Sequence, residues 1–163
     1  LRQAGVFPIV VFSGRDMGNR KVVESFIAQN DLIDQVKVLG FVPAEDMQGL
    51  YNGCRAVLMP TYFGPTNLPP LEAWLIGKPL IYSRYFHEQA GNAAILIDPD
   101  NSNDLAKAMI AIMDDRLCIE LVQKGRRRLQ EIEIQRNRAE MELLRRLVQF
   151  EKRSRCWRAK PSS

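Results

Sequence analysis

A loop rich in glycine and proline, TYFGPTNLPPLEAW (residues 61–74), joins a predicted buried strand to a predicted helix. Gly64 and Asn67 permit backbone conformations that most residues avoid, and Gly64 also lets a ligand approach the chain closely. Pro69 and Pro70 suit the first turn of a helix, where their missing N–H groups leave no helical hydrogen bond unmade. Ligands of open parallel sheets bind at the carboxyl ends of strands, and helix N-termini attract anions. The sequence therefore predicts a rigid ligand-binding loop at this junction.

Glu72 stands in the first turn of the helix that follows this loop. Its carboxylate offers two acceptor oxygens, which suits a pair of vicinal hydroxyl groups such as those of a ribose. A carboxylate in a first helical turn also interacts favourably with the helix dipole when no ligand is present. On the pattern alone, both interpretations stay open.

The residues that commonly bind metals are few and scattered. Cys54, Cys118 and Cys156 lie far apart and show no CxxC spacing, so the sequence indicates neither a zinc site nor a disulfide framework, and a reducing compartment is the simplest location. The single histidine, His87, excludes a multi-histidine metal site but leaves a Ser-His-Asp relay open. The cysteines and the histidine thus give no sign of a metal site, and we expect the protein to need no cofactor.

The acidic stretch DPDNSND (residues 98–104) begins like a calcium-binding loop. A calcium loop needs glycine at its sixth position and glutamate at its twelfth, where this chain has Asn103 and Met109. We interpret the stretch as a turn followed by a helix that Asn101 or Ser102 caps.

Short apolar runs alternate with amphipathic segments from residue 8 onward. This alternation is typical of βαβ units, in which a parallel sheet carries helices on both faces. After the second run, Met47, Leu50, Tyr51 and Cys54 recur at helical spacing and predict a stripe that packs on the sheet. We expect strands at 8–13, 36–40, 56–60, 79–83 and 94–98, and helices at 19–30, at 44–54, from Pro69, at 103–113 and from Arg116.

The 163 residues suit one domain, and their net charge of +4 is concentrated late in the chain. The basic runs KGRRRLQ (124–130) and FEKRSRCWRAK (150–160) are typical of a solvated helix face or a frayed tail. Because no platform of aromatic residues accompanies them, we expect no binding to nucleic acid. Trp157 and Arg158 suit a weak contact with a membrane surface. No apolar run is long enough to cross a bilayer.

Residues 36–83 and 87–109 resemble the C-terminal, donor-binding half of the retaining glycosyltransferases of group 1, also called family four. The similarity runs from about Val10 to the helix after residue 135, with its pieces in the order and spacing of the family. Members have two facing Rossmann-like domains. The resemblance implies that residues 1–131 form a Rossmann-like nucleotide-sugar-binding domain that lacks its first strand, and that residues 132–163 form a C-terminal amphipathic helix and a basic tail.

The family's loop carries one glutamate associated with the donor sugar and, after seven intervening residues, a second associated with the nucleotide's ribose. The second matches Glu72, whereas the first falls at Gly64, so this chain departs from the pattern there. The resemblance implies that the backbone amides around Thr66, Asn67 and Leu68 contact the sugar and the diphosphate. The side chains of Thr66 and Asn67 can supply hydrogen bonds in place of the missing carboxylate.

The turn after the second strand, Gly40, Phe41 and Val42, would by the same resemblance line the base pocket through backbone groups. The alternative is a plain strand-to-helix turn in which Phe41 belongs to the core. Glu88 matches a glutamate often seen in the family before the last strand, and we expect His87 beside it to pack or to cap a helix.

The family's donor domain begins with a strand and a loop whose Arg and Lys neutralise the diphosphate, and this sequence contains no match to them. The first residues, LRQAGVFPIVVFSGRD, also lack an initiator methionine and the order of a signal peptide. We therefore expect part of a longer enzyme whose partners are a nucleotide-sugar donor and a missing N-terminal acceptor domain.

The resemblance implies transfer of a sugar from a UDP- or GDP-sugar to a hydroxyl acceptor, with the anomeric configuration kept and no metal required. We expect no turnover by this chain alone, and a cytoplasmic location with any membrane contact at the surface. The alternative is a non-catalytic, doubly wound nucleotide-binding or regulatory domain. A receiver-type regulator would need an acidic cluster after the first strand, where only Asp16 is present.

Overall fold

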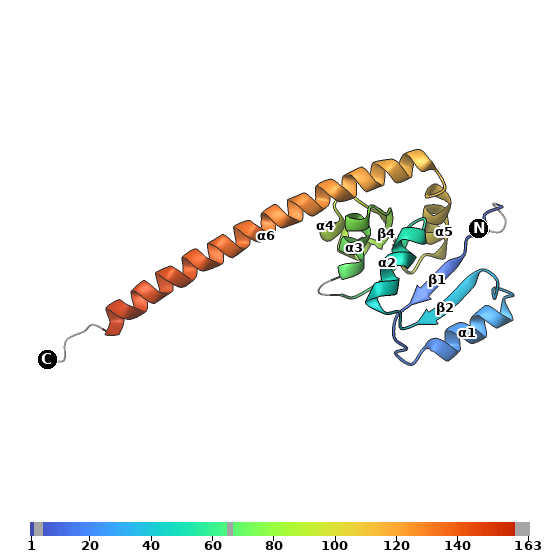
Figure 1. Cartoon of the computed structure of the whole chain (residues 1–163), viewed down its shortest axis with the longest axis horizontal. Helices are drawn as coiled ribbons and strands as arrows, with labels where there is room; N and C mark the ends of the chain where they lie inside the picture. Colours follow the sequence, from blue (N-terminus) through green and yellow to red (C-terminus); the bar gives the residue numbers. More distant parts are fainter. Residues whose placement is uncertain (2–4, 65–66, 159–163) are drawn as a thin grey trace.

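Strands and helices alternate along the chain, as the sequence predicts (Figure 1). The computed structural model describes residues 1, 5–64 and 67–158. Each strand lies within a segment predicted to be one, and together they give an α/β fold. The strands are β1 (Val10–Ser13), β2 (Val36–Gly40), β3 (Val57–Met59), β4 (Leu80–Ser83) and β5 (Ile95–Ile97).

All strand pairs are parallel, but the strands form two sheets where the sequence predicted one sheet of about five strands. β1 pairs with β2, and β3, β4 and β5 pair in that order. Within the described ranges no strand pair joins β1 to β3, so each has one edge without a strand neighbour. Apolar periodicity locates strands but carries no signal for which of them pair, which is why the division was not predicted.

Five of the described helices follow the predicted order, whereas η2 and α4, between the fourth and fifth strands, were not predicted. At α5 the side-chain oxygen of Asn101 accepts hydrogen bonds from the backbone N–H groups of Asn103 and Asp104, so Asn101 rather than Ser102 is the cap. Gly77 ends α3 in the left-handed conformation, with φ of 80°, which glycine adopts without strain. The helices are α1 (Arg20–Gln29), α2 (Ala44–Gly53), α3 (Leu68–Ile76), the 3-10 turn η2 (Arg84–Phe86), α4 (His87–Ala90), α5 (Ser102–Ala111) and α6 (Asp115–Arg158).

The core surrounds β4, whose four residues are all buried. Because side chains alternate across a strand, β4 contributes to two apolar clusters. Leu80 and Tyr82 join Trp74 of α3 and the partly buried Leu129 of α6 on one face. The opposite cluster contains Ile81 with residues of β5 and α5. The three-stranded sheet therefore has helices on both faces, as predicted.

The long helix α6 packs on the domain through its first part only. Leu121 is buried, and the packed residues end with Ile132. Close contact occurs at Gly125, where an added Cβ would lie only 2.5 Å from Cδ1 of Trp74. From residue 133 to residue 153 every residue is exposed, and this part of α6 extends away from the rest of the molecule (Figure 1).

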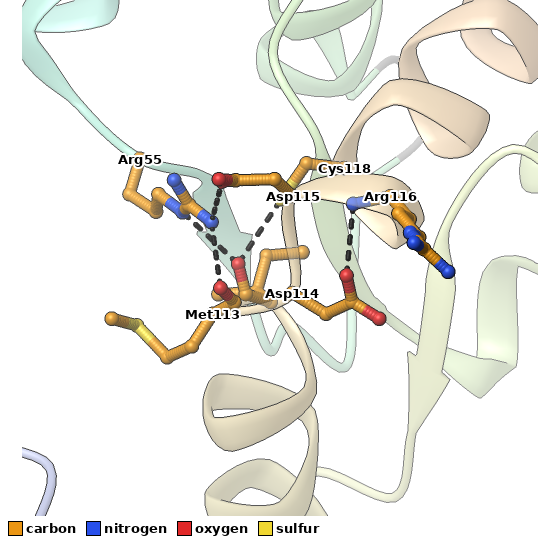
Figure 2. Close-up of polar contacts among 7 residues, drawn as sticks. Arg55, Met113, Asp114, Asp115, Arg116 and Cys118 are labelled. Carbon is orange, nitrogen blue, oxygen red and sulfur yellow. Dashed lines mark hydrogen bonds and ion pairs between the residues drawn. The ribbon is translucent and has the colours of Figure 1, made fainter.

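Arg55 fixes the connection between α5 and α6 (Figure 2). Its guanidinium donates hydrogen bonds to the backbone oxygens of Ile112 and Met113, at 3.0 and 2.9 Å, and pairs with the Asp115 carboxylate at 2.6 Å. The Cys118 thiol donates to the same Ile112 oxygen at 3.0 Å. These bonds satisfy carbonyls at the end of α5 and hold the first residue of α6.

Among the helices that the structure describes, none combines the length and the apolar character needed to cross a membrane.

Candidate functional site

An open pocket of about 750 Å³ lies where β3 and β4 end. The loop after β3 and the start of α3 form one side, and η2 and α4, which directly follow β4, form the other. This is the edge at which open parallel sheets bind ligands. The lining residues are Gly64, Asn67, Leu68, Leu71, Tyr85, Phe86, His87, Glu88 and Gln89.

The loop side of the pocket is held by a closed set of hydrogen bonds around Asn67, which is 5% exposed. The Asn67 amide donates to the Tyr82 hydroxyl, which donates to the Gln89 side-chain oxygen at 2.8 Å, and the Gln89 amide donates to the Asn67 backbone oxygen at 3.1 Å. The Tyr82 ring stacks on Phe86 with centroids 5.2 Å apart. Loop, core strand and α4 are therefore tied together at this pocket.

Gly64 lies directly against Asn67. A Cβ added at Gly64 would stand 1.7 Å from Oδ1 of Asn67, much closer than two non-bonded atoms can approach. The present arrangement of Asn67 therefore requires glycine at position 64, and any side chain there must displace the Asn67 amide.

Arg128 of α6 holds the other side of the pocket. Its guanidinium donates to the backbone oxygens of Gln89, at 2.9 Å, and of Glu88, and pairs with Glu131 at 2.8 Å. Its side chain is only 16% exposed. The interpretation of the run 124–130 as a solvated face is therefore wrong for Arg128, because this residue satisfies the carbonyls at the end of α4.

Glu72 contacts Tyr51 of α2. The prediction that Glu72 stands in the first turn of this helix is wrong, because α3 begins at Leu68 and Glu72 is its fifth residue. The Tyr51 hydroxyl donates to Oε2 of Glu72 at 2.6 Å, and Tyr51 is 9% exposed. Burial, and then this hydrogen bond to a carboxylate, raise the pKa of Tyr51 well above its ordinary range. The hydroxyl therefore stays protonated and holds the exposed Glu72 side chain in one orientation.

The turn Gly40–Val42 contacts the loop after β1 rather than the pocket lining. Gly40 has a φ of 74°, and its backbone oxygen accepts from the Gly14 N–H at 2.8 Å. The Phe41 ring carries the Arg15 guanidinium 5.3 Å from its centre and is 64% exposed, so the alternative that placed Phe41 in the core is wrong. A base-binding role for this turn stays a prediction.

Charged groups near the site are mostly engaged in the fold. Arg84 pairs with Asp98 at 2.9 Å, and the Lys78 ammonium donates to the backbone oxygens of Asn52 and Cys54 at the end of α2. Lys78 is thus a cation at the C-terminal end of α2. Among the described residues, no group of three or more His, Cys, Asp or Glu side chains could hold a metal ion.

The structure brings together part of the predicted site. Gly64, Asn67 and Leu68 line one pocket, Glu72 stands beside it on α3, and Thr66 and the side chains of Trp157 and Arg158 lie outside the described part. The sequence did not predict that Tyr85 lines the pocket or that the Gln89 side chain bonds to Tyr82 and Asn67. It also did not predict that Arg128 binds the backbone at the end of α4. The separation of Arg128 and Gln89 along the chain left no local pattern that could reveal their contact.

Comparison with known proteins gives one family. Residues 7–115, more than half of the chain, match the sequence model of the family described as glycosyl transferases group 1. The O-antigen chain mannosyltransferase B of Escherichia coli is 29% identical over 82 residues, which cover 49% of this chain and 22% of that protein.

Among solved structures, sucrose-phosphate synthase of Thermosynechococcus elongatus aligns with a TM-score of 0.66 and 24% identity, over 82% of this chain and 38% of that one. The HepE protein of Anabaena in complex with UDP-glucose aligns with a TM-score of 0.65 and 21% identity, over 82% of this chain and 40% of that one. These alignments confirm the Rossmann-like fold class. The chain spans well under half the length of each of these proteins.

Proposed function

The chain belongs to the group 1 glycosyltransferases, and from this premise we propose that it is the donor-binding part of a retaining enzyme. The donor is a UDP- or GDP-sugar, and the acceptor is a hydroxyl group. The observation that carries the proposal is the pocket at the carboxyl ends of β3 and β4, which the loop before α3 and the start of α3 line. The HepE protein, which shares the fold, is described with UDP-glucose bound.

The diphosphate of the donor lies at the N-terminus of α3. Pro69 and Pro70 carry no N–H, so the first turn offers only the amides of Leu68 and Leu71, next to that of Asn67. These amides and the positive end of the helix dipole favour the negative charge that develops on the leaving group. The residues described in the pocket lining include no lysine or arginine. The cations that complete the stabilisation therefore come from another part of the enzyme, and this chain alone does not turn over.

Glu72 binds the ribose of the nucleotide. Tyr51 occupies Oε2, and no hydrogen bond within the described residues uses Oε1. A carboxylate oxygen held by a neighbour on one side and free on the other suits a hydroxyl donor from the ligand. Tyr51 is then a positioning residue, because it fixes the direction in which Oε1 points.

Titration of the chain with UDP, GDP and, as a control, inorganic phosphate tests the proposal. We expect UDP or GDP to shift backbone amide signals of Asn67, Leu68 and Leu71 in NMR spectra, with the same affinity in the presence of a chelator. Failure of both nucleotides to bind contradicts the proposal and favours the non-catalytic alternative.

A substitution then tests the ribose contact. Glu72→Gln removes a charged acceptor, and hydrogen bonds to charged groups are worth about 1.5–3 kcal/mol, so we expect at least about tenfold weaker binding of the nucleotide. Inorganic phosphate should bind the variant and the parent alike, because it has no ribose. The matched control is Glu45→Gln in the first turn of α2, which should leave the nucleotide affinity unchanged. Equal nucleotide affinities for Glu72→Gln and the parent refute the ribose contact.

A further inference from the structure

The part of α6 beyond the domain carries an apolar stripe that nothing in the described structure covers. Ile134, Met141, Leu144 and Val148 are 52%, 55%, 50% and 51% exposed. An isolated, solvated helix gains nothing from large apolar side chains, and amphipathic helices usually obtain their stability by burying such a stripe. The stripe therefore points to a partner surface.

The spacing of the stripe is that of a coiled coil. Ile134, Met141 and Val148 recur every seven residues and occupy position a of a heptad, and Asn137 and Leu144 occupy position d. The next d position is the charged Glu151, so the seam ends at Val148. A shallow hollow on the helix runs between these side chains, lined by Ile134, Asn137, Arg138, Met141, Glu142 and Arg145. Such a hollow is what a knob from a second helix fills.

The seam formed by these a and d positions does not face the domain. At about 100° per residue, its centre lies about 150° around α6 from the centre of the stripe that packs on the domain through Leu121, Leu129 and Ile132. A second helix can therefore approach the seam without meeting the domain. Leu143 and Phe150 lie on the domain side of the helix and are not part of the seam.

The charged residues beside the seam favour one kind of partner helix and one orientation of it. Position g holds Glu133 and Glu140, and position e holds Arg138 and Arg145. The next g position is Leu147, so the charge pattern covers two heptads. In a parallel, in-register pair of helices, g of one copy meets e of the other five residues later, which brings Glu133 to Arg138 and Glu140 to Arg145, each twice by symmetry. In an antiparallel pair, g meets g and e meets e, so like charges face each other. No ion pair within the described residues engages these four side chains.

We propose that residues 133–148 form a parallel, in-register, two-stranded coiled coil with a second copy of this chain. In this register the Asn137 side chains of the two copies meet at the seam, where each amide can donate a hydrogen bond to the other. The coiled coil contains only about two heptads, so the dimer is in reversible equilibrium with the monomer. This proposal does not rest on the site described above, and a nucleotide that fails to bind leaves it unaffected.

Charge reversal tests the proposal in solution. Sedimentation equilibrium of the chain should show a concentration-dependent dimer. Glu133→Lys with Glu140→Lys, or Arg138→Glu with Arg145→Glu, converts all four attractive contacts into repulsive ones, so we expect either double variant alone to dimerise at least about tenfold more weakly. An equimolar mixture of the two should restore dimers, because its heterodimer has four attractive contacts.

The matched control is Arg136→Glu with Arg153→Glu. It makes the same change in net charge as Arg138→Glu with Arg145→Glu, but at positions c and f, away from the seam, and should dimerise like the parent. Circular dichroism checks that each variant stays helical. The proposal is overturned if the parent is monomeric at every concentration or binds anionic phospholipid vesicles as a monomer. It is also overturned if the mixture shows no gain over the separate variants.

Discussion

Replacing Gly125 by alanine sets two physical effects against each other. Gly125 lies inside α6, and its added Cβ would stand 2.5 Å from Cδ1 and 2.9 Å from Cγ of Trp74. Trp74 is 1% exposed, and its indole N–H donates to the backbone oxygen of Ala93 at 3.0 Å. The atoms that the new methyl group meets are therefore part of a packed core and cannot move aside cheaply.

The sizes of these two effects determine whether the variant is less or more stable than the parent. Alanine favours a helix interior over glycine by about 0.8–1.0 kcal/mol. Overpacking a well-filled core costs about 1–3 kcal/mol, and a shift of Trp74 that broke its buried hydrogen bond would add about 1–3 kcal/mol. We expect Gly125→Ala to lower the free energy of unfolding by up to about 2 kcal/mol if Trp74 keeps its hydrogen bond, and by about 1–5 kcal/mol if it loses that bond.

Gly49→Ala is the matched control. Gly49 also lies inside a helix, α2, but an added Cβ there meets nothing within 4 Å. This change should raise the free energy of unfolding by up to about 1 kcal/mol, because only the propensity acts. Urea unfolding followed by circular dichroism measures both variants, and equal slopes against denaturant would show that the unfolded ensemble is unchanged.

The test is that the two variants should change the free energy of unfolding in opposite directions. If Gly125→Ala stabilised the chain as Gly49→Ala does, the methyl group would have found free space, and α6 could not lie against Trp74 as described. The docking of α6 that places Arg128 beside the pocket would then be wrong as well.

Three further predictions concern the cap, the loop and the buried tyrosine. Asn101→Ala should lower the free energy of unfolding by about 1 kcal/mol in urea, because α5 loses its N-cap; no loss would mean that the cap is not formed in solution. Gly64→Ala should displace the Asn67 amide from the Tyr82 hydroxyl and destabilise the chain by about 1–3 kcal/mol, and unchanged NMR signals of Asn67 would refute the contact. The pKa of Tyr51 in the folded chain lies above its ordinary value of 10.0, so the stability that Tyr51 contributes is complete below pH 10 and is lost as the pH rises through the folded pKa. In Tyr51→Phe the loss of stability at alkaline pH, measured by urea unfolding, should therefore be smaller than in the parent. An identical loss would contradict the raised pKa.

The strands, most helices and the position of the site could be predicted because they depend on local patterns. The apolar run around Leu80 identified β4, and the glycine and proline residues of the loop before α3 identified the edge where the pocket lies. The hydrogen bond from Tyr51 to Glu72 joins two helices and has no local signature, although helical spacing correctly predicted that Tyr51 packs inward. Arg128 was misinterpreted for the same reason, since a basic run on a helix looks solvated until the carbonyls that it binds are known.

Because the strands form two separate sheets, we expect the two sheets to unfold locally at different free-energy costs. β4 has a strand on each side and no exposed residue, whereas β1 and β2 pair only with each other and β1 exposes three of its four residues. Local opening costs least where little apolar surface is lost to water. Backbone amides of β1 and β2 should therefore exchange with deuterium well before those of β4, through a partial unfolding that leaves the three-stranded sheet and its pocket intact. The free energy of that partial unfolding measures how tightly the N-terminal β1–α1–β2 unit is coupled to the rest of the chain. Any partner that covers the open edge of β1 should slow the exchange of these amides.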